Sequence, residues 1–178
     1  VRNLMGYHSE VDAQFEKALA QLKAQGAIIV DNANIETSDK WGDAEYSILL
    51  HEFKADINHY LANTKSGLPK SLTDLITFNK KHTPLEMADF GQEIFLMAEE
   101  KGPLSNRDYR KDLKNAKRWS GKEGIDATIA KHQVDLLIAP TTGPAWKIDS
   151  VNGDHYSGSA SSPAAVSGYP HITVPMGT

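Results

Sequence analysis

The residues of this chain with the clearest potential for chemistry lie in a helix of the first half and in a turn-rich stretch near the end. His51 and Glu52 begin like a zinc-protease motif, in which two histidines four residues apart share one helix face. Position 55 is alanine, however, and His59 lies about two turns beyond His51, too far away to share one metal ion. We therefore predict no metal site and interpret this face of the helix as polar surface.

The second candidate is a group of serines in a turn of small residues, residues 158–162. A serine nucleophile of the elbow type needs Gly-x-Ser-x-Gly directly after a strand, and neither the spacing nor the strand is present. Asp154 and His155 would complete a triad only if two adjacent residues pointed at one serine, which is rare. We predict that these serines cap a helix or bind backbone, and we assign no catalytic residue in this chain.

The most informative stretch is the short apolar run at residues 134–139, which ends at Pro140 and opens into a long loop. Such a run is typical of a strand buried on both faces. Ligands of open α/β sheets collect beyond the carboxyl ends of these strands. The loop that follows, residues 141–156, mixes hydroxyls, glycines and aromatic side chains, as a pocket wall does. A plain surface loop has the same composition, so both interpretations stay open at this point.

The elements that position these residues follow from periodicity and from capping signals. Apolar residues at helical spacing, together with possible cap residues, predict helices that begin at Ser9, Asp43, Ser71, Thr83 and Ser105. We expect the Thr83 helix to bend or pause at Gly91, and the Ser105 helix to be interrupted by Gly121 and Gly124. A short helix is expected within residues 159–167. Three apolar runs predict strands, at 27–30, 134–139 and 171–174. The fold class is therefore α/β and rich in helix.

Composition narrows the class of protein. The chain has 178 residues, no cysteine and a formal net charge of −4, which argues against a nucleic-acid-binding surface. Its densest basic stretch, residues 107–122, is interleaved with acidic and aromatic residues and is predicted to be a solvated helix face. No apolar run reaches the roughly 20 residues of a membrane span, so we expect a soluble protein without a membrane partner. The compartment, cytoplasmic or bacterial periplasmic, stays open.

Several segments of the chain, taken in their order along the sequence, resemble the C-terminal region of amidase signature enzymes, most strongly the peptide-amidase-like branch. The resemblance covers nearly the whole chain, and its weight lies in the order of the segments. These segments are RNLMGYH (2–8), YSILLHEFKADINHY (46–60), FGQEIF (90–95), DLLIAPT (135–141), the loop 146–156 with VNGDHY (151–156), and SPAAVSGYPHITVPMG (162–177).

The resemblance implies a fragment of the amidase signature fold, with a few central mixed-sheet strands covered by helices. It divides residues 1–178 into a helix–strand unit (about 1–35), a helical cap (about 41–133), and sheet strands with a cleft loop (about 134–178). It also implies that the loop faces the cleft, and the residues expected to bind substrate are Thr141, Thr142, Gly143 and Trp146.

In such enzymes a serine, a cis-serine and a lysine hydrolyse the C–N bond of a carboxamide, without a metal or organic cofactor. The resemblance places all three before Val1, and Ser161 and Ser162 lie in the wrong context to replace them. It also places further residues after 174–177. We therefore expect a fragment of an amidase, inactive alone, that supplies cleft wall and scaffold. The implied substrate is a small amide, with the C-terminal amide of a peptide as one candidate.

Two other functions stay open. The chain could be a non-catalytic binding or interaction module with the same ancestry, or a transamidosome-type subunit that delivers ammonia to a partner. The peptide-amidase-like segments count against the second of these, and the coding sequence before Val1 would separate a fragment from a module. Because strands without neighbours expose backbone edges and apolar faces, we also predict that the isolated chain self-associates into dimers or larger species.

Overall fold

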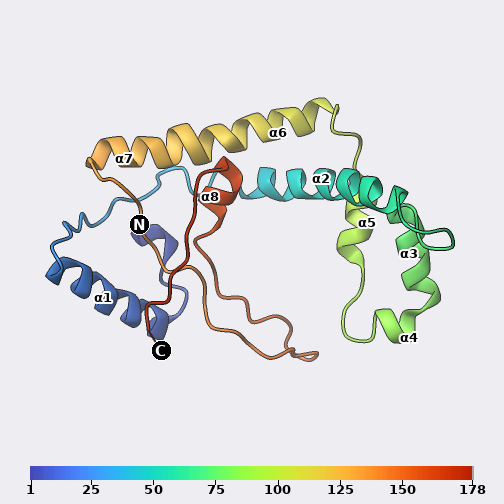
Figure 1. The fold of residues 1–178 in the computed structure, drawn as a ribbon, viewed down its shortest axis with the longest axis horizontal. Coiled ribbons are helices and arrows are strands. Elements are labelled where there is room, and N and C mark those ends of the chain that lie inside the picture. Colours follow the sequence, from blue (N-terminus) through green and yellow to red (C-terminus); the bar gives the residue numbers. More distant parts are fainter. Residues whose placement is uncertain (178) are drawn as a thin grey trace. The chain divides into compact units, whose positions relative to one another are not determined.

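The computed structural model describes residues 1–177 and divides into two compact units (Figure 1). Unit 1 combines residues 1–41 with the chain from residue 116 onward, and unit 2 consists of residues 42–115. Unit 1 contains η1 (Arg2–Leu4), α1 (Ser9–Ala24), η2 (Arg118–Asp126), α7 (Ala127–His132) and α8 (Ser162–Ser167). Unit 2 contains α2 (Gly42–Ala62), α3 (Leu72–Lys81), α4 (Thr83–Glu86), α5 (Glu93–Glu99) and most of α6 (Arg107–Lys117).

Two helix starts show how far capping signals can be trusted. The cap of α3 is confirmed, because the hydroxyl of Ser71 accepts a hydrogen bond from the backbone N–H of Asp74 at 3.1 Å. Helix α1 begins at the predicted Ser9, but the predicted cap is wrong. There, Nδ1 of His8 accepts from the N–H of Val11 at 3.4 Å, because His8 has extended backbone while Ser9 is already helical.

The later helix starts need similar corrections. Helix α6 begins at Arg107, and Asn106 rather than Ser105 caps it, since the side-chain oxygen of Asn106 accepts a hydrogen bond from the N–H of Asp108 at 2.7 Å. Helix α4 begins at Thr83 as predicted, with proline in its first turn, but it has only four residues. The chain then leaves the helical conformation before Gly91, and α5 is a separate helix.

The glycines at 121 and 124 do not interrupt the helix, contrary to prediction. Helix α6 continues through the π-helical segment η2 into α7. A Cβ atom on Gly124 would lie 2.5 Å from the carbonyl oxygen of Trp119 and 3.2 Å from Cγ2 of Ile35, so glycine lets the two segments approach closely. The wider turn leaves the Trp119 carbonyl accessible, and the hydroxyl of Thr37 donates to it at 2.7 Å.

The Thr37 hydrogen bond gives a first testable prediction. Thr37 is buried, so Thr37→Val would leave the Trp119 carbonyl without its partner at a cost of about 1–3 kcal/mol in the free energy of unfolding. Urea unfolding followed by tryptophan fluorescence measures this loss. The matched control is Thr77→Val, which removes an exposed hydroxyl that bonds the Thr73 carbonyl within α3. Equal effects of the two substitutions would contradict the prediction.

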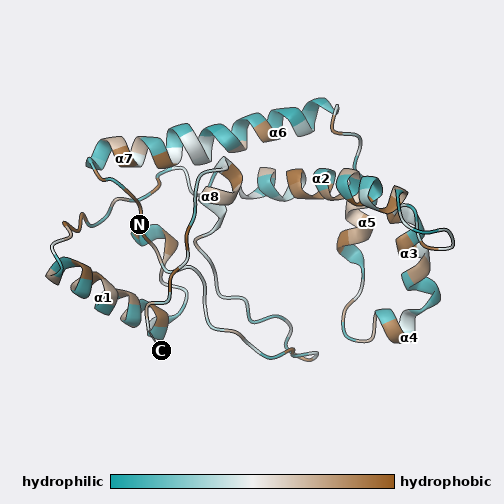
Figure 2. Ribbon diagram, in the orientation of Figure 1, coloured by the Kyte–Doolittle hydropathy of each residue, from teal (hydrophilic) through white to brown (hydrophobic). Residues whose placement is uncertain are grey.

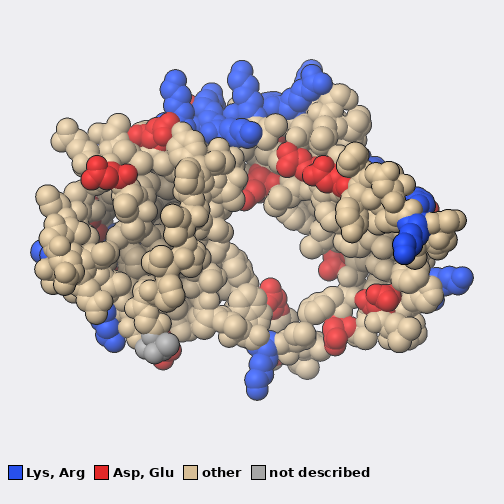
Figure 3. Space-filling model, in the orientation of Figure 1, with Lys and Arg blue, Asp and Glu red and all other residues tan. Residues whose placement is uncertain are grey.

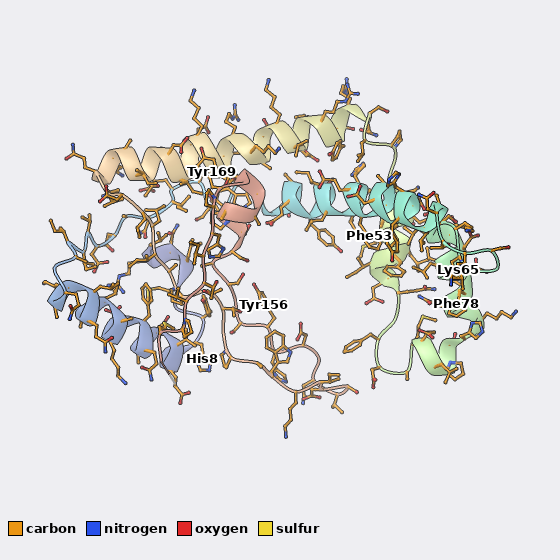
Figure 4. All side chains as sticks on the ribbon, viewed as in Figure 1. His8, Phe53, Lys65, Phe78, Tyr156 and Tyr169 are labelled. Atoms are coloured by element: carbon orange, nitrogen blue, oxygen red, sulfur yellow. The ribbon has the colours of Figure 1, made fainter. Side chains whose placement is uncertain are left out.

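The core of unit 2 forms where α2, α3 and α5 meet. Leu50, Leu72, Ile76 and Ala98 are buried together, as the apolar faces of three amphipathic helices should be. Partly buried aromatic rings extend this core: the ring of Phe53, which is labelled in Figure 4, stacks on that of Phe95 with centroids 5.3 Å apart. The unit therefore has its own hydrophobic core.

The His51 region of α2 is buried rather than polar surface, which corrects the prediction. Tyr109 of α6 covers it, with the two rings 5.3 Å apart, and Nδ1 of His51 contacts the carbonyl of Ser47 at 2.9 Å. The Tyr109 hydroxyl donates to Glu52 at 2.8 Å, and burial together with this carboxylate raises the pKa of Tyr109 to about 12. Within residues 1–177, no three His, Asp or Glu side chains come together as a metal site requires.

The predicted strands are extended segments that do not form a sheet, so the mixed sheet is not confirmed. Residues 1–177 contain no β-strand, and their β pairing is one isolated antiparallel bridge between Thr142 and Ser159. An apolar run predicts an extended conformation, but a strand also needs a neighbouring backbone about 4.8 Å away to complete its hydrogen bonds. Figure 2 shows that the segments after α1 and after α7 are nevertheless markedly hydrophobic.

An apolar groove of about 720 Å³ runs along these extended segments in unit 1. Phe15 and Leu19 of α1 line it together with residues 27–30 and 134–138. A smaller cavity of about 330 Å³ is lined by residues 135–139 and by side chains of η2, α7 and α8. Residues 135–138 thus border both cavities, with α1 lining one of them and the later helices lining the other.

The solvent-facing side of α6 carries the predicted basic stretch. Figure 3 shows Lys and Arg side chains projecting along this helix, and Arg107, Lys111 and Lys114 are all exposed. This confirms the prediction of a solvated helix face. None of the helices formed by residues 1–177 combines the length and apolar character needed to cross a membrane.

Candidate substrate-binding loop

The predicted binding residues lie on the first arm of a hairpin-like loop in unit 1. The extended segment 134–139 ends at the buried Pro140, and residues 141–160 then leave and return before α8. The two arms meet at their base, where the N–H of Ala160 donates to the carbonyl of Thr141 at 2.9 Å. The hydroxyl of Thr142 donates to the carbonyl of Gly158 at 3.2 Å. The loop therefore has a defined base.

The tip of the loop is a turn organised by one carboxylate. Asp149 accepts hydrogen bonds from the N–H groups of Val151 and Asn152 at 2.9 and 2.8 Å, and from the Asn152 side chain at 2.9 Å. These bonds favour the charged form and lower the pKa of Asp149. His155 adds a contact to the same carboxylate at 3.4 Å. The turn holds the two arms together at their far end.

Between the base and the tip, one aromatic side chain from each arm meets the other. The rings of Trp146 and Tyr156 lie 6.1 Å apart at an interplanar angle of 61°, an edge-to-face arrangement. Trp146 is 43% exposed and Tyr156 is 57% exposed, so both keep surface available to a ligand. Tyr156 is labelled on the loop in Figure 4. Tyr156 is not among the four predicted binding residues, although it belongs to the loop 141–156, whose composition is typical of a pocket wall.

The structure brings all four predicted residues into contact with the opposite arm, Thr141 through the hydrogen bond from Ala160, and Thr141 also contacts the C-terminal segment. Thr142 bridges to Ser159, Gly143 faces Ser157, and Trp146 meets Tyr156. A Cβ atom on residue 143 would collide with the Ser157 hydroxyl, so a larger residue there would require this hydroxyl to rotate away. The hydroxyl of Thr141 lies 3.3 Å from that of Thr173. The two cavities described for unit 1 are lined by other residues.

The serines and the histidine near the loop have partners that differ from those of a triad. The Ser159 hydroxyl lies 3.2 Å from that of Ser161, and His155 contacts Asp149 rather than a serine. The nucleophile–base pair of a serine hydrolase requires a base within hydrogen-bond reach of the serine hydroxyl. The loop therefore offers hydroxyls, backbone polar groups and an aromatic pair, a set suited to binding a polar ligand that also carries apolar groups.

The family model described as Amidase matches residues 2–178. The chain belongs to the amidase family. Among curated relatives, this amidase chain is 31% identical over 161 residues to a probable amidase of Arabidopsis thaliana, covering 88% of this chain and 28% of the relative. It is 27% identical over 188 residues to a putative amidase of Schizosaccharomyces pombe, covering 94% of this chain and 31% of the relative.

Solved peptide amidases share the fold of this amidase chain. The peptide amidase PAM in complex with the competitive inhibitor chymostatin has a TM-score of 0.88 and 41% identity, covering 96% of this chain and 34% of that structure. The native peptide amidase of Stenotrophomonas maltophilia has a TM-score of 0.81 and 40% identity, covering 93% of this chain and 33% of that structure. The chain thus spans about a third of the length of the relatives it matches, and these likenesses confirm it as part of the amidase signature fold.

Proposed function

We propose that this chain is the part of an amidase that supplies one wall of the substrate cleft, in an enzyme that hydrolyses the C–N bond of a carboxamide. The membership of residues 2–178 in the amidase family carries this proposal. The likeness to peptide amidases at about 40% identity supports a peptide amide as the substrate class. A protein of the relatives' length would contain about twice as much further chain, where the catalytic groups lie.

The reaction then proceeds in two steps, with catalytic groups outside this chain. A serine oxygen attacks the carbonyl carbon of the amide, its proton passes to the departing nitrogen, and the C–N bond breaks to leave an acyl-serine. Water then attacks the acyl group, restores the serine and releases the carboxylic acid. The family resemblance assigns the proton relay to a cis-serine and a lysine. The role of this chain is to bind and orient the substrate.

The loop 141–156 divides that role between polar and apolar groups. The hydroxyls of Thr141 and Thr142 and the backbone at Gly143 face the amide and peptide groups of the substrate. The aromatic pair Trp146–Tyr156 holds an apolar side chain, because both rings keep exposed surface and meet edge to face. Rigid aromatic residues contribute large contact areas at little cost in conformational entropy.

The three extended segments become strands of a mixed sheet in the complete amidase. The groove supports this proposal, because within residues 1–177 the largely apolar segments 27–30 and 134–138 line it without a neighbouring strand. Burial of the exposed Ile28 and Leu136 by the rest of the protein would contribute about 1.5–3 kcal/mol for each side chain. Residues 41–133 act as the helical cap, and unit 2, which makes up most of them, has its own core.

The test of the loop's function is Trp146→Ala in the longer amidase that contains this chain. Loss of the aromatic contact is expected to raise KM for a peptide amide about tenfold, with kcat changed by less than about threefold. Trp146→Phe should restore most of the affinity. Val151→Ala at the exposed tip of the same loop is the control. An unchanged KM in Trp146→Ala would remove this loop from the substrate site.

A further inference from the structure

We propose that Tyr7 is a positioning residue for substrate binding. It holds the base of the hairpin-like segment 141–160, which contains the loop 141–156, in the shape that binds substrate. The inference rests on the proposed function of that loop. Tyr7 lies in the turn between η1 and α1, 133 residues before Pro140 in the chain. Its hydroxyl donates a hydrogen bond to the carbonyl of Pro140 at 2.6 Å. Pro140 directly precedes Thr141, so this bond fixes the point where the first arm begins.

The ring of Tyr7 also fixes the second arm of the loop. A Cβ atom on Gly158 would lie 2.8 Å from Cδ1 of Tyr7, and Gly158 has φ of +144°, so only glycine can lie flat against the ring. The carbonyl of Gly158 accepts the hydrogen bond from the Thr142 hydroxyl. The side chain of Tyr7 therefore touches both arms. On the first arm it bonds Pro140, next to the predicted binding residue Thr141, and on the second it contacts Gly158, which is hydrogen-bonded to Thr142.

The surroundings of Tyr7 keep its hydroxyl in the donating form. Burial raises its pKa above the usual range, with smaller contributions from the charges of Asp12 and Tyr156. The phenol is protonated at physiological pH, as an ordinary tyrosine is, and the upward shift of its pKa extends this form to higher pH. In the sequence, Tyr7 belongs to RNLMGYH, one of the segments that resemble the amidase family. The contact with Pro140 gives this segment a structural role.

The experiment is Tyr7→Phe in the longer amidase that contains this chain, a change that removes only the hydroxyl. We expect KM for a peptide amide to rise about 2- to 10-fold, the effect of one lost hydrogen bond, while kcat stays within about twofold. Hydrogen exchange should become faster at the amide of Ala160, which closes the base of the loop. Tyr60→Phe, the same change at a hydroxyl-bearing ring that is 72% exposed on α2, is the matched control and should alter neither quantity.

The outcomes separate this inference from the proposed function. If Trp146→Ala raises KM while Tyr7→Phe changes neither KM nor exchange, the role of Tyr7 is refuted. A fall in kcat and in the melting temperature without a KM effect would also refute it, because that pattern reports a general structural role. If exchange accelerates in Tyr7→Phe but Trp146→Ala leaves KM unchanged, the loop does not bind substrate and the functional part of both proposals fails.

Discussion

The isolated 178-residue chain is expected to release no ammonia or amine from a peptide amide above the uncatalysed rate, whereas the longer amidase that contains it should turn over. The difference is expected to be at least about 10⁶-fold, the lower end of enzymatic rate enhancements. The physical reason is that Ser159, Ser161 and His155 have partners of their own and form no nucleophile–base pair. Binding groups alone bring a substrate into place but cannot move its protons.

The measurement is ammonia release from an amidated dipeptide by both proteins at equal concentration. Ser159→Ala and Ser161→Ala in the longer protein are the controls, and both should retain turnover within about threefold. Turnover by the isolated chain that disappears in Ser159→Ala or Ser161→Ala would overturn the assignment of catalysis to the remainder of the enzyme.

Leu136→Asp is expected to have opposite effects in the two proteins. In the isolated chain Leu136 is 65% exposed and lines the apolar groove of unit 1, so a carboxylate there remains solvated and should reduce self-association. In the longer amidase the same position is proposed to be a buried strand. An unpaired charge there should destabilise the fold by several kcal/mol and abolish soluble, active protein.

Light scattering of the isolated chain and urea unfolding of the longer amidase measure the two effects. The matched control is Leu85→Asp, which places the same charge at a leucine that is 81% exposed on α4 and does not line the groove. It should leave the association of the isolated chain unchanged. The account of the groove is wrong if the isolated wild-type chain is monomeric at high concentration, or if the longer amidase tolerates Leu136→Asp as well as Leu85→Asp.

The helices show which parts of the fold can be predicted from local sequence. Ser71 caps α3 as expected, because a serine followed three residues later by a carboxylate satisfies the first turn by itself. The capping of α1 by His8 depends on the backbone conformation before the helix. Gly124 predicted a break from its low helix propensity, yet the helix continues because Thr37 and Ile35, more than 80 residues earlier, pack against η2. Contacts between residues so far apart in the sequence cannot be predicted from the residues around Gly124.

The strands and the loop show the same division between local and distant determinants. The apolar runs predict strands, yet none forms within residues 1–177, because pairing depends on backbone that must lie alongside these segments. Composition indicated the loop 141–156 as a possible pocket wall, and the family resemblance implied Thr141, Thr142, Gly143 and Trp146 as its binding residues. Neither showed that Tyr156 meets Trp146 or that Gly143 faces Ser157, since both contacts depend on how the two arms pair. The contact from Tyr7 was still less predictable, because it crosses 133 residues.

The most direct test of the account is photo-crosslinking of the longer amidase with a peptide amide that carries a photoreactive aromatic side chain, followed by mass spectrometry of the labelled peptides. We expect labelling within residues 141–156, centred on Trp146 and Tyr156 and suppressed by excess unlabelled peptide amide. Labelling that is suppressed in the same way but found only outside this loop, for example on α1 or along the apolar groove, would contradict this expectation.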